Sequence, residues 1–414
     1  MGTFDRNVRA AARPRGIVLL VLTLLPALGR GEGGFDDCVL RLRAEAEQRG
    51  VTAQTAAAVL GAVRERPEVL EADRRQPEFI ESFSTYLARR VTEQRIERGQ
   101  ELLREHAALL ARLEKRYGVP GQYLIAFWGL ETNYGRVLGR LPVFDSLATL
   151  ACDTRRGDYF AAELMKALEI VERGDVAAPE MTGSWAGAMG HTQFMPSVYL
   201  ENGVDGDGDG AVDLWGSVPD ALASAASFLH GLGWTPGWRW GREVMLPSGF
   251  DYYSAGLDRS KTLAEWRAAG VRKTDGGPID AADVQASLLL PAGHLGPAFL
   301  VYANFEAILR WNRSEHFGLA VGLLADRIAG AGSLRSPPPE EPPLSRESVE
   351  ALQRALNLRG FDSGEPDGVA GSATRRAVRE WQRANGVAAD GHIGTELLRR
   401  LGIEQLAEKA LAPP

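Results

Sequence analysis

Glu131 is the residue of this sequence best placed for acid–base chemistry. It follows the apolar run 123–130, YLIAFWGL, and begins the segment 131–135, ETNYG. A carboxyl group at the end of a buried helix loses hydration, and this loss favours its neutral form. Such a group holds a proton at neutral pH and donates it to a leaving oxygen. A surface glutamate that caps the next turn is the alternative that this spacing leaves open.

A second segment, 183–197, has the composition of a ligand-binding loop. It reads GSWAGAMGHTQFMPS, with small residues between aromatic ones. Glycines let the backbone approach a ligand closely. Ser184 and Gln193 carry groups that hydrogen-bond sugar hydroxyls or acetamido groups. A glycine- and alanine-rich helix contact would have the same composition.

An aspartate-rich loop at 205–213 has the ligand spacing of an EF-hand. That motif places oxygen ligands at positions 1, 3, 5 and 9, a glycine at position 6 and a peptide carbonyl at position 7. Position 12 is Gly216, where the motif has a bidentate glutamate. A run of Asp-Gly turns without metal is the alternative. The predicted Ca²⁺ ligands are Asp205, Asp207, Asp209, Asp213 and the carbonyl of Ala211.

The elements that position these residues are mostly helices. Residues 36–115 are rich in Ala, Leu, Glu and Arg at helical spacing, which predicts two or three amphipathic helices. The run 121–130 is apolar nearly all round and predicts a buried helix. Further helices are expected near 159–173 and 220–232, and a helical pair over 299–328. No series of alternating strands dominates, so the predicted fold class is mainly α.

The first 30 residues have the organisation of a secretory signal peptide. Basic residues at 6–15 precede the apolar run 17–28, which is shorter than the about 20 residues of a membrane-spanning helix. Small residues at 27–29 supply a cleavage site. We therefore expect export, with an uncleaved anchor as the alternative.

Two cysteines are present, Cys38 and Cys152, and the six histidines are scattered singly. Without a Cys-x-x-Cys pair, no zinc site can be read from the sequence. In an exported protein two thiols are most simply explained by a disulfide. We predict a Cys38–Cys152 bond, and two buried free thiols are the alternative.

The composition is that of a globular chain of two to three domains. It has 414 residues, of which 45% are hydrophobic and 24% charged. The net charge is −7, and because residues 1–30 carry +4, the remainder carries −11. Such an acidic protein is not expected to bind nucleic acid through phosphate contacts.

The C-terminal part begins with a proline-rich segment. Residues 333–345 read SLRSPPPEEPPLS, a composition expected not to pack and to act as a stiff spacer. Beyond it, the pattern Asp-Gly-x-x-Gly occurs at 367–371 and 390–394, each time before a helical pattern. The module should therefore contain three helices.

This module resembles the bacterial peptidoglycan-binding domain of three-helix type. The resemblance implies binding to peptidoglycan glycan strands, whereas a small helical cap without a ligand is the alternative. The matching residues are Val349, Leu352-Gln353, Leu356, Gly360-Phe361, Asp367-Gly368, Gly371, Thr374, Ala377, Trp381-Gln382, Gly386, Asp390-Gly391 and Gly394.

The large domain resembles the membrane-bound lytic murein transglycosylase B family over roughly residues 35–330. The resemblance rests on the ETNYG segment, on 183–197, on the aspartate loop and on two later motifs, Tyr302-x-Asn304-Phe305 and Arg310-Trp311-Asn312-Arg313-Ser314. The expected organisation is a leader at 1–30, a catalytic domain at 31–332, a linker at 333–345, the module at 346–402 and a tail at 403–414.

The resemblance implies a lysozyme-like helical domain that cleaves the β-1,4 bond between N-acetylmuramic acid and N-acetylglucosamine. Glu131 would first protonate the glycosidic oxygen and then act as base on the muramyl C6 hydroxyl, which closes a 1,6-anhydro ring. This reaction needs no catalytic cofactor, and its substrate implies a periplasmic location.

The resemblance also implies site residues. Phe228 stands where a family member can carry a tyrosine, and His191-Thr192 replaces a Tyr-Gly pair found in some members. The family supplies its last metal ligand further along, a role that Asp220 fits as part of a structural Ca²⁺ site. The expected substrate-site residues are Ser184, Gln193, Tyr302, Asn304 and Phe228.

Two other functions stay open at this stage. A muramidase would need a second carboxylate about 5–9.5 Å from the first, and the nearest candidates in sequence are Asp145, Asp153 and Asp158. A non-catalytic wall-binding protein would use Glu131 only structurally. Other cell-wall enzymes are candidate partners, and a monomer is the default expectation.

Overall fold

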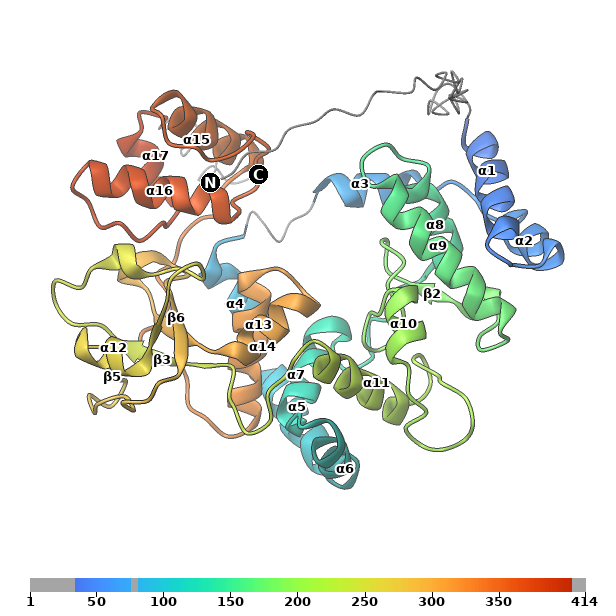
Figure 1. Ribbon diagram of the computed structural model, residues 1–414, viewed down its shortest axis with the longest axis horizontal. Coiled ribbons are helices and arrows are strands. Elements are labelled where there is room, and N and C mark those ends of the chain that lie inside the picture. Colours follow the sequence, from blue (N-terminus) through green and yellow to red (C-terminus); the bar gives the residue numbers. More distant parts are fainter. Residues whose placement is uncertain (1–33, 76–80, 404–414) are drawn as a thin grey trace, which may run out of the picture.

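The computed structural model describes residues 34–75 and 81–403. Helices dominate the fold (Figure 1). The buried hydrophobic residues of these two ranges form four clusters. The expected leader at 1–30 lies outside the described residues, as does the tail from residue 404 onwards. Within the described part, no helix is both long and apolar enough to span a bilayer.

Six short helices occupy the region where two or three were expected, so that prediction is wrong. Three of them begin where a hydroxyl side chain accepts the backbone N–H of the residue three positions later, at Thr52, Ser82 and Thr92. Such caps favour a helix start over continuation of the preceding helix. The helices are α1 (Phe35–Gln48), α2 (Ala53–Leu60), α3 (Pro67–Arg75), α4 (Phe83–Arg90), α5 (Glu93–Glu105) and α6 (Ala107–Tyr117).

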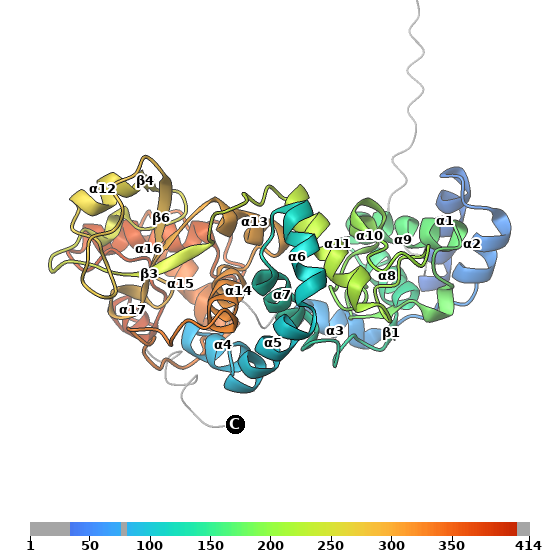
Figure 2. The same ribbon diagram turned by 90° about the horizontal axis from the view of Figure 1, so that it is seen from below.

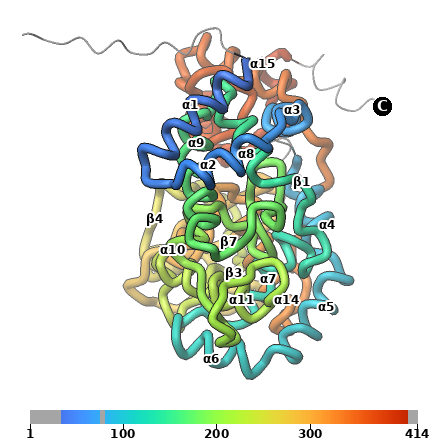
Figure 3. The backbone as a smooth tube through the Cα atoms, turned by 90° about the vertical axis from the view of Figure 1, so that its right-hand side faces the viewer, coloured from blue at the N-terminus to red at the C-terminus, as the bar shows by residue number. Residues whose placement is uncertain are grey.

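One lobe of the catalytic domain is built by helices from separate parts of the chain, and it faces the viewer in Figure 3. Here α1, α2 and α3 pack against α8 (Val143–Ala151) and α9 (Gly157–Glu172), and α10 (Pro196–Asn202) packs on α9. A short strand pair, β1 (Leu141–Pro142) and β2 (Thr182–Gly183), closes the lobe. Cys38 of α1 and Cys152 at the end of α8 form a disulfide, the pairing that the sequence predicts.

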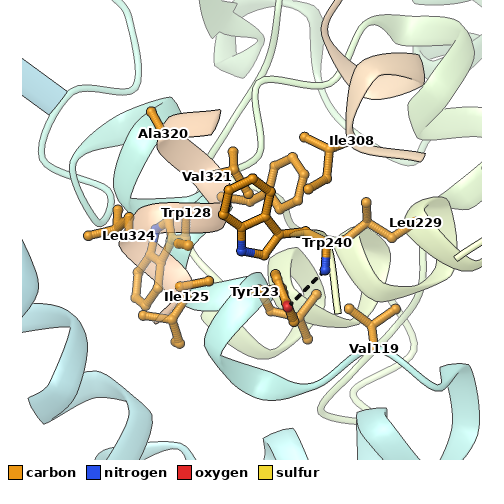
Figure 4. Packing of buried hydrophobic residues seen from close by; sticks show 14 of the residues in the cluster. Val119, Tyr123, Ile125, Trp128, Leu229, Trp240, Ile308, Ala320, Val321 and Leu324 are labelled. Atoms are coloured by element: carbon orange, nitrogen blue, oxygen red, sulfur yellow. Dashed lines mark hydrogen bonds between the residues drawn. The ribbon is translucent and has the colours of Figure 1, made fainter. Parts of the chain in front are cut away.

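The centre of the molecule is α7 (Gly121–Thr132), which is buried along almost its whole length, as predicted. It is surrounded by α5, α6, α11 (Val218–Gly231) and α14 (Glu315–Ile328), while α13 (Ala303–Trp311) packs on α11 and α14. Figure 4 shows this core around Trp240, whose backbone N–H donates to the hydroxyl of Tyr123 on α7. This packing fixes α7 within the core.

A five-stranded antiparallel sheet forms a further lobe, which the sequence analysis did not anticipate. Its strand order is β4-β6-β7-β3-β5, and α12 (Leu263–Ala268) follows β4. Residues 299–301, expected to begin a helix, belong to β7, because a short apolar run fits a buried strand as well as a helix. The strands are β3 (Gly241–Met245), β4 (Ser260–Thr262), β5 (Arg272–Lys273), β6 (Gln285–Leu289) and β7 (Ala298–Val301).

The C-terminal module contains the three helices that the sequence predicts: α15 (Arg346–Leu358), α16 (Ser372–Ala384) and α17 (Thr395–Arg400). Its two Asp-Gly turns are built alike. The Gln353 amide donates to Asp367 and accepts from the N–H of Gly368, and the same pair of bonds joins Gln382 to the turn at 390–391. Both turn glycines have φ of +74°, which L-residues rarely adopt.

The linker, residues 333–345, is extended, but the expectation that it would not pack is wrong. Two of its backbone N–H groups donate to the carboxylate of Glu243 on β3, at 2.9 and 2.8 Å. Glu341 accepts from Nε2 of His392 in the module at 2.8 Å, and Leu344 is buried in the module core. The module therefore lies against the β-sheet lobe, at the opposite end of the molecule from α1 and α2 (Figure 2).

Candidate active site

Glu131 is the next-to-last residue of α7, and its Oε1 accepts a hydrogen bond of 2.9 Å from the indole Nε1 of Trp311, the last residue of α13. Burial raises the pKa of Glu131 to about 7, although the Trp311 hydrogen bond and the positive charge of Arg90 oppose this rise. Within the described residues, Oε2 has no hydrogen-bond partner. The carboxyl group is thus half protonated near neutral pH and has one oxygen free to act on a substrate.

Aromatic rings form the wall behind this carboxyl group. The Trp311 ring lies 4.4 Å from Phe127, 5.4 Å from Phe194 and 5.1 Å from Phe228, measured between centroids. Phe228 comes from α11 and also packs edge-on against Phe194. The structure therefore places Phe228 beside the hydrogen-bond donor of Glu131, where it offers an apolar ring face and no hydroxyl.

The backbone on both sides of the site is strained. Among the described residues, the non-glycine residues with a left-handed backbone are Asn133, Tyr134 and Gln193, with φ between 50° and 60°. Two of them lie two and three positions after Glu131, and the third lies in segment 183–197. Residues in sparsely populated conformations persist only where surrounding contacts hold them, and they cluster at functional sites.

Segment 183–197 is a tight loop whose polar side chains are oriented by the backbone. The Ser184 hydroxyl accepts from the N–H groups of Ala186 (3.3 Å) and Ala188 (3.1 Å), which leaves its O–H to donate elsewhere. The Gln193 amide nitrogen donates to two backbone carbonyls at 3.1 and 2.9 Å. One of these carbonyls belongs to Leu138, so Gln193 is tied to the chain that follows the Glu131 turn.

His191 joins this segment to the Glu131 turn. Its Nδ1 accepts from the Trp128 indole at 2.8 Å, and its carbonyl accepts from the Thr132 hydroxyl at 3.0 Å. Burial lowers the pKa of His191, so the ring is neutral. A Cβ atom at Gly135 would lie 2.2 Å from the imidazole, which explains a glycine there. His191 therefore has a structural position between the two segments.

Two expected substrate residues are not at this site. Asn304 has no exposed surface, and its amide is saturated by the backbone of Thr235 and by the carbonyl of Trp238. Tyr302 is 4% exposed and belongs to the core of the β-sheet lobe. Both side chains hold the start of α13 in place. The prediction that they contact substrate is corrected accordingly.

The acidic residues considered as a second catalytic carboxylate have other roles or positions. Asp145 is buried and accepts two hydrogen bonds from the Arg66 guanidinium, at 2.9 and 2.7 Å. Asp153 lies 3.8 Å from a guanidinium nitrogen of Arg74, and Asp158 is exposed in the first turn of α9. No carboxylate is among the described groups that shift the pKa of Glu131.

The aspartate loop brings together part of the predicted ligand set. Oxygens of Asp205, Asp207 and Asp209 lie within 4.8 Å of one another, an all-oxygen set that suits a hard cation. Asp213 instead closes a turn by accepting two backbone N–H groups, and both oxygens of buried Asp220 accept backbone N–H groups. Ala211 lies on the loop, with its N–H donating to Asp209.

Two family models match this chain. The Transglycosylase SLT domain matches residues 34–326, and a peptidoglycan binding domain matches residues 345–401. The chain belongs to the transglycosylase SLT family. Its helical catalytic domain has the lysozyme-like fold of that family, which confirms the predicted fold class.

Relatives of this SLT protein are similar in sequence and in structure. It is 33% identical over 251 residues to the membrane-bound lytic murein transglycosylase B of Escherichia coli K12, a match that covers 59% of this chain and 66% of that protein. It is 46% identical to SltB3 of Pseudomonas aeruginosa, solved in complex with NAG-anhNAM-pentapeptide, with a TM-score of 0.86 over 90% of this chain and 100% of that one.

Two further solved structures are more distant. SltB1 of Pseudomonas aeruginosa is 32% identical, with a TM-score of 0.64, and the match covers 70% of this chain and 98% of that one. Slt35 of Escherichia coli in complex with calcium is 29% identical, with a TM-score of 0.62, and the match covers 70% and 92%.

The sequence analysis of this SLT protein missed the role of Trp311. It quoted this residue within the motif 310–314 but gave it no task, because its partner Glu131 lies 180 positions earlier. Arg90, whose charge lowers the pKa of Glu131, was missed as well. The only available sign was that Trp311 belongs to a family motif.

Proposed function

We propose that this protein is a lytic transglycosylase that cleaves the β-1,4 bond between N-acetylmuramic acid and N-acetylglucosamine in peptidoglycan. Protonated Glu131 donates its proton to the glycosidic oxygen, so the bond from that oxygen to the muramyl C1 breaks. The resulting carboxylate then takes the proton of the muramyl C6 hydroxyl. The C6 oxygen bonds to C1, and the product is a 1,6-anhydromuramyl end.

The observation that carries this proposal is the state of Glu131. A pKa of about 7 lets one group serve as acid and then as base without a large driving force in either direction. Trp311 fixes Oε1 by donating to it, which orients the carboxyl plane and leaves Oε2 for the proton transfer. The same indole stabilises the carboxylate formed after the first step.

Among the described residues considered as a second carboxylate, none is assigned a catalytic role here, and this favours transglycosylation over hydrolysis. Retaining and inverting hydrolases place a second carboxyl group about 5–9.5 Å from the first. Asp145, the buried candidate, is committed to the Arg66 guanidinium and to a backbone N–H. With Asp145 committed in this way, we assign the role of nucleophile to the substrate's own C6 hydroxyl.

On the substrate side, we assign sugar contacts to three of the five predicted residues. Ser184 has its O–H available to donate, and the oriented amide of Gln193 leaves Oε1 available to accept. Phe228 offers an apolar face beside Trp311. These groups suit the hydroxyl and acetamido groups of the amino sugars and their apolar ring faces.

The C-terminal module is assigned the role of holding the enzyme on peptidoglycan glycan strands. A tethered binding module raises the local concentration of substrate at the catalytic domain. Peptidoglycan as substrate and the expected leader place the enzyme in the periplasm, where we expect it to act as a monomer. Other cell-wall enzymes are its candidate partners.

The loop around Asp205 is proposed to bind a structural Ca²⁺ ion, remote from the chemistry. Backbone N–H groups of Gly208 and Gly210 donate to Asp205 and lower its pKa, so it is ionised and ready to bind a cation. Slt35, a relative, was solved in complex with calcium. Catalysis itself needs no cofactor in this proposal.

The decisive experiment is mass spectrometry of the fragments released from purified peptidoglycan. Wild-type protein is expected to release muropeptides one water lighter than hydrolytic products, and Glu131→Gln none. Glu201→Gln, the same change at an exposed position on α10, is the matched control and should retain full activity. Reducing muramyl ends would establish a muramidase instead, and no products from wild type would leave a wall-binding protein.

A further inference from the structure

His191 forms hydrogen bonds to three separate parts of the chain around the active site. Its backbone N–H donates at 2.8 Å to the carbonyl of Leu214, in the chain that follows the aspartate loop. Its carbonyl accepts at 3.0 Å from the hydroxyl of Thr132, the last residue of α7. Its Nδ1 accepts at 2.8 Å from the indole of Trp128, one turn earlier on α7. All three bonds fix segment 183–197, to which His191 belongs.

The imidazole of His191 is enclosed by the elements that it joins. The residue is 8% exposed, and its ring lies edge-on against Trp128, with 5.4 Å between the ring centroids. A Cβ atom at Gly135 would lie 2.5 Å from Nδ1, so the turn after Glu131 packs directly on the ring. Because Nδ1 accepts, the proton of the neutral ring is on Nε2. Loss of the ring would leave the buried Trp128 N–H without an acceptor, which is costly.

Glu131 lies between the two α7 residues that His191 holds. Trp128 precedes it by three positions, so both lie on the same side of the helix, and Thr132 follows it directly. The segment on the other side of these bonds carries Ser184 and Gln193, to which we assigned sugar contacts. The spacing between the proton donor and the sugar-binding side chains thus depends on His191.

We propose that His191 is a positioning residue of the reaction, which holds the sugar-binding segment 183–197 at a fixed distance from Glu131. It acts through Trp128 and Thr132 and touches neither the substrate nor the reacting atoms. Displacing a catalytic group by about 1 Å can cost about 100-fold in rate, so such a residue matters although it does no chemistry. This inference rests on the proposed function, because it assigns a further role in the same reaction.

The test compares His191→Leu with His191→Asn. Leucine fills much of the space of the ring but accepts no hydrogen bond, whereas the Oδ1 of asparagine can accept from the Trp128 indole in place of Nδ1. With soluble glycan strands as substrate, His191→Leu should lower kcat at least about tenfold and change KM less. His191→Asn should recover most of this loss.

The pH profile supplies a second measurement that a merely destabilising substitution would not change. A loosened segment lets water reach Glu131, so its pKa should fall and the alkaline limb of the kcat/KM profile should move to lower pH. Burial, the Trp311 hydrogen bond and the charge of Arg90 are the described causes of the pKa of Glu131. His191 is not among them, so a moved limb reports a change in the burial of Glu131.

Trp266→Phe is the matched control for the loss of a buried indole hydrogen bond. Trp266 has no exposed surface, donates to the carbonyl of Ala286 at 2.9 Å, and lies in the core of the β-sheet lobe. The substitution should lower the melting temperature, but kcat and the alkaline limb should stay at their wild-type values.

Three results would overturn the inference: wild-type kcat and pH profile in His191→Leu, equal losses in His191→Leu and His191→Asn, or a loss of kcat in Trp266→Phe as large as in His191→Leu. If wild type released no products, the proposed function would fail, and stability would then test the inference. The pH-dependent stability gained by Glu131→Gln should be smaller in the His191→Leu background than in wild type. An equal gain in both would overturn the inference without any activity measurement.

Discussion

Replacing Glu131 with glutamine should stabilise this protein, and the gain should depend on pH. The substitution keeps the shape of the side chain and an oxygen that accepts from the Trp311 indole. It removes the ability to ionise. The effect of the charge on folding can therefore be read from the stability difference between wild type and variant.

The sign and size follow from the pKa. Folding raises the pKa of Glu131 from 4.5 to about 7, so between these values the folded protein holds a proton that the unfolded chain has released. Wild-type stability therefore falls as pH rises from 4.5 to 7 and is level above that. Each unit of difference between the folded and the unfolded pKa corresponds to about 1.4 kcal/mol, so the loss of wild-type stability is at most about 3 kcal/mol. Because the side chain is partly exposed, we expect about 1–3 kcal/mol.

The assay is unfolding of wild type, Glu131→Gln and Glu201→Gln at pH 4.5, 6 and 8, followed by tryptophan fluorescence and calorimetry. The Glu131→Gln variant should equal wild type at pH 4.5 and exceed it at pH 8, whereas Glu201→Gln should match wild type throughout. A difference that does not change with pH, or a variant less stable than wild type at pH 8, would refute the argument that burial keeps Glu131 neutral.

Three further changes have defined outcomes. Trp311→Phe removes the hydrogen-bond donor that lowers the pKa of Glu131. The alkaline limb of the pH profile of kcat/KM should therefore move to higher pH. An unmoved limb would show that this hydrogen bond does not affect the pKa of Glu131. Replacing both Cys38 and Cys152 with serine removes a cross-link between residues 114 positions apart. By restricting the unfolded chain, this cross-link contributes about 4–5 kcal/mol to stability. The melting temperature of the double variant should therefore equal that of reduced wild type and lie below that of the oxidised protein. Ca²⁺ should raise the melting temperature of wild type but not of Asp207→Asn, and a calorimetric titration without heat for wild type would exclude the site.

The acid–base candidate was predictable because its cause is local in sequence. An apolar run of helical length ends at Glu131, and a helix apolar nearly all round has to be buried. The three helices and the two Asp-Gly turns of the module were predictable for the same reason. Each turn needs a glycine at positive φ, and Gly368 and Gly391 supply it.

Long-range pairing was not predictable. The sheet escaped notice because β6 and β7 are short apolar runs, which fit a strand or a buried helix equally well until their partners are known. Asn304 looked like a substrate residue because its amide can bind sugars. Only the fold shows that the backbone at 235–238 already occupies its hydrogen-bonding groups.

The sequence by itself thus determined the chemistry that this protein carries: a carboxyl group on a buried helix, an aspartate-rich loop, two cysteines and a turn-rich module. Tertiary structure decided the state of those groups. The pKa of Glu131 depends on burial beneath rings from α11 and α13 and on an indole 180 positions away. Periodicity reports which residues face inward, but not which partners they meet there.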